Sequence, residues 1–154
     1  MRLSRRAILG GVGLGGAAAV VAMANPNLLY TLITEDVDGV QLSAPDAHAQ
    51  ALAGQITLID IRRPDEWART GSGQGAHRVD LRRDDFVTVL DGLTNGDRAA
   101  PIALICARGV RSARTANRLA EAGFTNIIDV PEGMLGSAAG PGWLARDLPL
   151  NRDP

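Results

Sequence analysis

The sequence feature that most constrains the fold is an apolar run that leads into a short loop and then into a helix. Pro101–Ile105 has the composition of a buried strand. The segment that follows has a candidate N-cap in Ser112 and carries apolar residues at helical spacing up to Gly123. The only cysteine of the chain, Cys106, stands between them. This order predicts a strand, a tight loop and a helix, with a thiol at the mouth of the loop.

Two arginines, Arg108 and Arg111, follow Cys106 closely. The start of a helix directs backbone N–H groups and the positive end of its dipole at one point, which favours negative charge there. We therefore interpret Cys106 as a thiolate nucleophile. The alternative is that Cys106 is a small buried core residue, but Gly109 and two arginines are unusual neighbours for such a residue.

Further apolar runs of strand length alternate with segments of helical spacing. We expect strands at 40–42, 56–61, 76–81 and 126–130, helices at 43–52 and after Asp84-Asp85, a short final helix at 143–146, and a loop at 71–75. This alternation predicts an α/β domain whose central parallel sheet is flanked by helices on both faces.

Charged residues lie at the end of the 56–61 run. The carboxyl ends of parallel strands meet at the edge where ligands bind, so we expect Asp60 and Arg62 at the same edge as Cys106. Arg62 and Glu66 are four residues apart and could pair across the start of the next helix. For each residue alone, a solvated charge cluster is an equally good interpretation.

The loop Cys-x-x-Gly-x-Arg between a strand and a helix resembles the active-site loop of rhodanese-type sulfurtransferases. Leu58–Trp67 resembles the first signature of that family, an Asp-x-Arg strand end followed by Pro-x-Glu-Trp, while Val130–Met134 and Gly142–Leu150 resemble its closing segments. The resemblance covers roughly residues 40 to 150. One segment departs from it, because Gly71–Ala76 stands where the family usually has Gly-His-Ile-Pro-Gly-Ala.

This resemblance implies a rhodanese-like fold and a sulfurtransferase that carries sulfane sulfur as a persulfide on Cys106. The expected donor is a small anion such as thiosulfate, and the expected acceptor is a small thiol, a protein thiol or cyanide. Substrate would be bound by the loop residues Ala107, Arg108, Gly109, Val110 and Arg111. The supporting residues would be Asp60, Arg62 and Glu66.

Two other functions remain open. A Cys-x5-Arg phosphatase or an arsenate reductase has a similar scaffold, but such a loop needs arginine at position 112, where this chain has Ser112. The second is a non-catalytic binding module or a periplasmic persulfide carrier. The intact Cys106 argues against an inactive domain but is compatible with a carrier.

The composition excludes several kinds of chemistry. The chain has 154 residues and all 16 basic residues are arginine, which excludes Schiff-base chemistry on lysine and a lysine-dependent phosphate loop. With a formal net charge of −1 and no basic face, nucleic acid is not an expected partner. His48 and His77 are far apart and no Cys/His cluster has metal-ligand spacing, so we expect neither metal nor cofactor.

The N-terminal residues have the pattern of a targeting segment. Ser4–Leu9 contains Arg5-Arg6 and resembles a twin-arginine export signal, and residues 7–24 form an uncharged stretch that ends in a small-x-small cleavage pattern. We expect residues 1–24 to be an export signal or a membrane anchor, 25–39 a linker, and 40–150 one rhodanese-like domain. The expected location is the periplasm, with membrane contact only through residues 7–24 if they are retained.

Overall fold

The computed structural model describes residues 26–153 of the chain, in which five parallel strands form a central sheet. The order of the strands is β1-β6-β5-β2-β4, so the strand that ends at Asp60 and the strand that leads into Cys106 are neighbours. The strands of the sheet are β1 (Val40–Gln41), β2 (Thr57–Asp60), β4 (Ala76–Arg78), β5 (Ile102–Ile105) and β6 (Ile127–Asp129). The helices are α2 (Pro26–Ile33), α3 (Ala44–Leu52), α4 (Pro64–Thr70), α5 (Phe86–Leu93), α6 (Val110–Glu121) and α7 (Gly142–Ala145).

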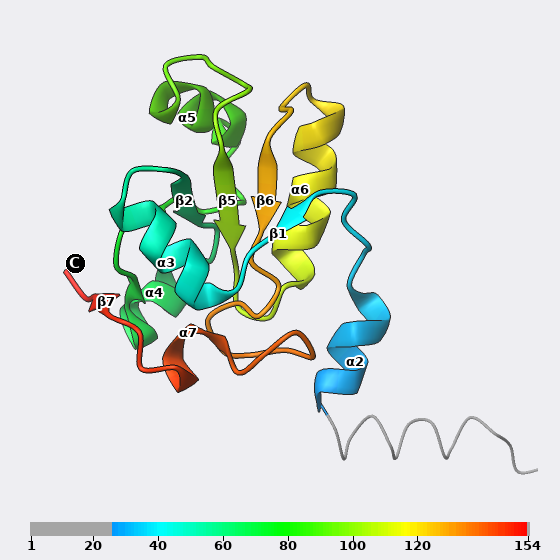
Figure 1. The fold of residues 1–154 in the computed structure, drawn as a ribbon, viewed down its shortest axis with the longest axis vertical. Coiled ribbons are helices and arrows are strands. Elements are labelled where there is room, and N and C mark those ends of the chain that lie inside the picture. The colour runs from blue at the N-terminus through cyan, green and yellow to red at the C-terminus, as the bar shows by residue number, and fades with distance from the viewer. Residues whose placement is uncertain (1–25, 154) are drawn as a thin grey trace, which may run out of the picture.

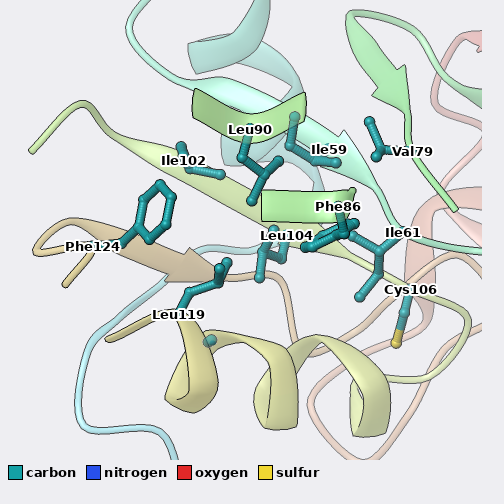
Figure 2. Packing of buried hydrophobic residues seen from close by; sticks show 11 residues of the cluster. Ile59, Ile61, Val79, Phe86, Leu90, Ile102, Leu104, Cys106, Leu119 and Phe124 are labelled. Atoms are coloured by element: carbon teal, nitrogen blue, oxygen red, sulfur yellow. The ribbon is translucent and has the colours of Figure 1, made fainter. Parts of the chain in front are cut away.

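Alternate residues of the strands face two separate hydrophobic clusters, one on each side of the sheet. On one side Ile102 and Leu104 of β5 pack in a cluster with residues of α5 and α6 (Figure 2). On the other side Ala103 and Ile105 pack in a cluster with residues of α3 and α7. The predicted α/β class, with a parallel sheet and helices on both faces, is confirmed.

Within residues 40–151, the predicted strands and helices agree with the structure to within one residue at each end, except at three places. The expected loop at 71–75 contains strand β3 (Ser72–Gly73), which pairs antiparallel with β7 (Leu150–Asn151). Strand β4 ends at Arg78 rather than at residue 81. The helix after Cys106 begins at Val110, and its N-cap is Gly109 at φ 85° rather than Ser112. A glycine is favoured at this left-handed position, which turns the chain into the helix sooner than a serine cap would.

The residues expected to form a linker contain helix α2. Figure 1 shows α2 at the end of the molecule toward which strands β5 and β6 point. Among the described residues, 26–153, no helix is long and apolar enough to cross a bilayer. The twin-arginine segment and the uncharged stretch 7–24 lie outside the described residues.

Candidate active site

Cys106 lies directly after strand β5 and before the first turn of α6, and it is 1% exposed. Its side chain is at the edge of the core cluster, beside the start of α6 (Figure 2). The first N–H groups of an α-helix have no partner within the helix, so they are available to an anion at this position. The predicted combination of strand, short loop and helix around the thiol is therefore present.

The backbone of the loop is held by the segment that follows β6. Met134 N–H donates to the carbonyl of Cys106 and Leu135 N–H donates to the carbonyl of Ala107, both at 2.9 Å. The contact is close: a Cβ on Gly133 would lie 2.5 Å from the carbonyl oxygen of Ala107, and a Cβ on Gly109 would lie 2.5 Å from that of Pro131. The conformation of the catalytic loop thus depends on two glycines as well as on its own sequence.

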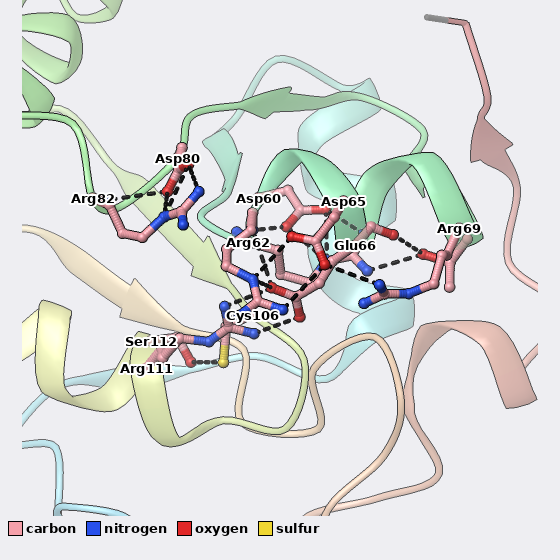
Figure 3. A network of polar contacts seen from close by, with 12 residues as sticks. Asp60, Arg62, Asp65, Glu66, Arg69, Asp80, Arg82, Cys106, Arg111 and Ser112 are labelled. Carbon is pink, nitrogen blue, oxygen red and sulfur yellow. Dashed lines mark hydrogen bonds and ion pairs between the residues drawn. The ribbon is translucent and has the colours of Figure 1, made fainter.

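Glu66 of α4 binds Arg111 in the first turn of α6. Arg111 donates from Nη1 to Oε2 and from Nη2 to Oε1, at 2.8 and 2.7 Å (Figure 3). These hydrogen bonds lower the pKa of Glu66 to about 2, and the same contact raises the pKa of Arg111. Arg111 therefore faces the site as half of an ion pair, with part of its positive charge compensated.

Asp60 and Arg62 form a second ion pair, which is fully buried. Arg62 donates from Nη2 to Oδ2 of Asp60 at 2.8 Å, and from the same nitrogen to the carbonyl of Gly71 at 2.7 Å. Ser72 donates its hydroxyl to Asp60 at 2.7 Å. The expected pairing of Arg62 with Glu66 is wrong. Arg62 forms its ion pair with Asp60 in the buried interior, and Glu66 of α4 forms its ion pair with Arg111.

The buried pair links strand β2 to helix α4. Arg62 also donates to the hydroxyl of Thr70, the last residue of α4, at 2.9 Å. The helix that carries Glu66 is thus fastened to the strand that carries Asp60. Thr70 in turn donates its hydroxyl to the carbonyl of Glu66 at 3.1 Å, so the buried pair is linked through α4 to the pair of Glu66 and Arg111.

Ser112 connects the thiol to a buried carboxyl that the sequence analysis did not select. The Sγ of Cys106 lies 3.6 Å from the hydroxyl of Ser112, which also contacts Asp129 at the end of β6. Asp129 is 1% exposed and its Oδ1 has no hydrogen-bond partner. Burial raises its pKa to about 6. A signal was available: Asp129 ends an apolar strand as Asp60 does, at the same edge of the sheet.

A cavity of about 290 Å³ opens onto Cys106. Four of the five loop residues predicted to bind substrate line it, and the fifth, Gly109, is buried in the turn behind them. Asp60 and Arg62 do not line the cavity, because both side chains are buried in the interior. Two lining residues were not predicted, Tyr30 of α2 and Leu135 after β6, since neither stands in a recognisable motif. Within 26–153, no group of three or more His, Cys, Asp and Glu side chains could hold a metal ion.

Comparison with protein families finds one match. The model of the Rhodanese-like domain matches residues 43–139. No curated protein matches the chain. The polysulfide-sulfur transferase homodimer from Wolinella succinogenes is 26% identical with a TM-score of 0.59, and the match covers 84% of this chain and 89% of that one.

Two more solved structures are similar. Rv0390 from M. tuberculosis is 25% identical, with a TM-score of 0.59 over 77% of this chain and 100% of that one. The wild-type protein EanB is 18% identical, with a TM-score of 0.57 over 75% of this chain and 28% of that one. The likeness to EanB concerns the fold alone.

Proposed function

Because the chain belongs to the rhodanese-like domain family, whose members include sulfurtransferases, we propose that it transfers sulfane sulfur through a persulfide on Cys106. One observation carries the proposal: the only thiol of the chain lines a cavity at a helix N-terminus, together with Arg108 and Arg111. These surroundings favour the binding of an anionic donor and of an anionic persulfide.

In the first half-reaction the Cys106 thiolate attacks the outer sulfur of thiosulfate. The sulfur–sulfur bond of the donor breaks, sulfite leaves with the bonding electrons, and Cys106 retains the outer sulfur as an anionic persulfide. The N–H groups of the first turn of α6 would stabilise that anion, and Arg108 would attract the donor.

In the second half-reaction an acceptor nucleophile, such as a small thiol, a protein thiol or cyanide, attacks the outer sulfur of the persulfide. The Cys106 thiolate is the leaving group and is ready for another donor. Such a cycle divides one difficult step into two and has ping-pong kinetics. A polysulfide is a second candidate donor, since the similar protein from Wolinella succinogenes is named a polysulfide-sulfur transferase.

The location proposed for this chemistry is the periplasm. It rests on Arg5-Arg6 and the uncharged stretch after them, which resemble a twin-arginine signal. A cleaved signal would release the domain, and a retained one would leave it anchored to the membrane through residues 7–24.

The decisive experiment is the intact mass of the protein after incubation with thiosulfate. We expect the mass of one added sulfur atom, lost again on addition of cyanide, and no addition to Cys106→Ser. A folded wild-type protein that stays unmodified in excess thiosulfate and polysulfide would refute sulfur transfer. Steady-state turnover then separates an enzyme from a persulfide carrier, and hydrolysis of an aryl phosphate at background rate is expected from a loop with Ser112.

A further inference from the structure

Helix α2 lies outside the matched family region and yet contributes to the catalytic cavity. The match begins at residue 43, while α2 spans Pro26–Ile33. The ring of Tyr30 lines the same cavity as Cys106 and Glu66. The residues that precede the domain thus form part of the wall around the thiol.

Tyr30 contacts this site through an arginine of the catalytic loop. The guanidinium of Arg108 lies over the Tyr30 ring, 5.0 Å from its centroid, which is a favourable cation–π distance. The same guanidinium donates to the carbonyl of Gly136 at 3.0 Å and to Oδ1 of Asn27 at 3.4 Å. Arg108 is therefore held from one side by the domain and from the other side by α2.

The position of α2 does not depend on Tyr30 alone. Directly after the helix, Glu35 forms an ion pair with Arg114 of α6 at 3.0 Å. Asn117, one turn further along α6, donates to the Glu35 carboxylate at 3.3 Å and to the carbonyl of Asp36 at 3.0 Å. A substitution of Tyr30 should consequently change the wall of the cavity and leave the segment docked.

A second cavity, of about 320 Å³, adjoins the first. It lies between α2 and the loop after β6, and its lining includes Thr31, Asp36 and Ser137. Among the residues that the structure describes, two line both cavities, Tyr30 and Arg108. The stacked pair of ring and guanidinium therefore belongs to the walls of both cavities.

We propose that Tyr30 is a specificity-determining residue of the active site, which holds Arg108 at the rim of the catalytic cavity and closes that cavity toward the adjoining one. The inference rests on the proposed function, because it assumes that an anionic sulfur donor enters beside Cys106. Arg108, held against the Tyr30 ring, supplies positive charge to an anionic donor. Arg111 supplies less, because its charge is partly compensated by Glu66. Without the ring, Arg108 keeps its contact with Gly136 but can turn away from the cavity.

The test compares three variants with wild type: Tyr30→Ala, Tyr30→Phe and, as a matched control on the same helix, Leu32→Ala, whose side chain is 72% exposed. We expect Tyr30→Ala to raise the KM for thiosulfate about threefold to thirtyfold with little change in kcat, as loss of a cation–π contact implies. Tyr30→Phe keeps the ring and should therefore have a KM close to that of wild type. Leu32→Ala should have the wild-type KM.

A double-mutant cycle shows whether Tyr30 acts through Arg108. In an Arg108→Ala background, Tyr30→Ala should cause no further rise in KM, whereas a merely structural role of Tyr30 would give additive effects. Additive effects, or equal KM values for Tyr30→Ala and Leu32→Ala, would overturn the inference. The added sulfur mass on Cys106 reports separately: if wild type forms the persulfide while the variants behave alike, the proposed function stands and only the role of Tyr30 fails.

Discussion

Arg111 and Glu66 bind each other through two hydrogen bonds of 2.8 and 2.7 Å in the cavity that Cys106 lines. Arg111 belongs to helix α6, which follows β5, and Glu66 belongs to helix α4, which follows β2, so the pair joins two crossover segments of the sheet. The pairing positions the guanidinium at the cavity and at the same time moderates its charge. Substitutions at the two positions should therefore have opposing effects on kcat/KM with anionic donors, and the two effects should be coupled.

Arg111→Ala should lower kcat/KM with thiosulfate by roughly tenfold to a hundredfold, the effect of losing one charge-assisted contact. It also leaves the Glu66 carboxylate unpaired next to the donor, which adds repulsion. The double variant Arg111→Ala with Glu66→Gln should consequently recover part of the loss. The measurement is steady-state kinetics with thiosulfate and with a neutral organic persulfide or polysulfide donor, which should be affected much less. Equal losses with both donors would contradict this role of Arg111.

Gly133→Ala should reduce persulfide formation although residue 133 does not line the cavity. A Cβ there would meet the carbonyl oxygen of Ala107 at 2.5 Å and must displace the catalytic loop. The matched control is Gly96→Ala, because Gly96 also has a positive φ but its Cβ would meet nothing within 4 Å. Both variants should lose about 1–3 kcal/mol of stability from backbone strain. Only Gly133→Ala should also form the persulfide slowly, and equal rates in the two proteins would show that the loop tolerates the displacement.

Asp129→Asn should stabilise the protein at neutral pH. Burial raises the folded-state pKa of Asp129 to about 6, above its ordinary value of 3.8, so the native state binds the proton more tightly than the unfolded state does. The favourable contribution is complete below about pH 4 and is lost as the pH rises through about 6. A shift of this size, from 3.8 to about 6, corresponds to at most about 3 kcal/mol at pH 7, which the neutral asparagine avoids.

The measurement for Asp129 is the free energy of unfolding by urea at pH 4, 5, 6 and 7 for wild type and variant. The difference between the two proteins should grow between pH 4 and pH 7. The exposed Asp85→Asn, whose partner is Arg83, should show no such growth. A difference that is independent of pH would mean that Asp129 is not the titrating group.

Replacing Arg5 and Arg6 by lysine should block export while preserving the positive charge of the N-terminal segment. A twin-arginine route requires the arginine pair itself, whereas the general secretory route requires only positive charge. The measurement is fractionation of cells that produce wild type or the double variant, with detection of precursor and mature forms. Export and processing of the variant at the wild-type level would favour the general secretory route or a simple anchor.

The sequence was a good guide wherever the relevant residues are neighbours in the chain. The thiol, the glycine and the two arginines of the loop are close neighbours in the chain (Cys106, Arg108, Gly109 and Arg111). Their order alone therefore predicted a thiol at a helix N-terminus. The apolar runs predicted the parallel strands, because a strand that is buried on both faces needs a continuous apolar segment. The sequence did not predict strands that pair with segments far away in the chain, as Ser72–Gly73 does with Leu150–Asn151.

By itself, the sequence determined the α/β class, the order of strand, loop and helix around Cys106, and the edge of the sheet at which Asp60 and Cys106 meet. Only the tertiary structure decided which side chains surround the thiol. Glu66 reaches Arg111 across 45 residues, Tyr30 arrives from a helix before the domain, and Asp129 comes from the neighbouring strand. The physical reason is that periodicity specifies which face of an element is buried, whereas the partner of a charged or aromatic side chain depends on how several elements pack together.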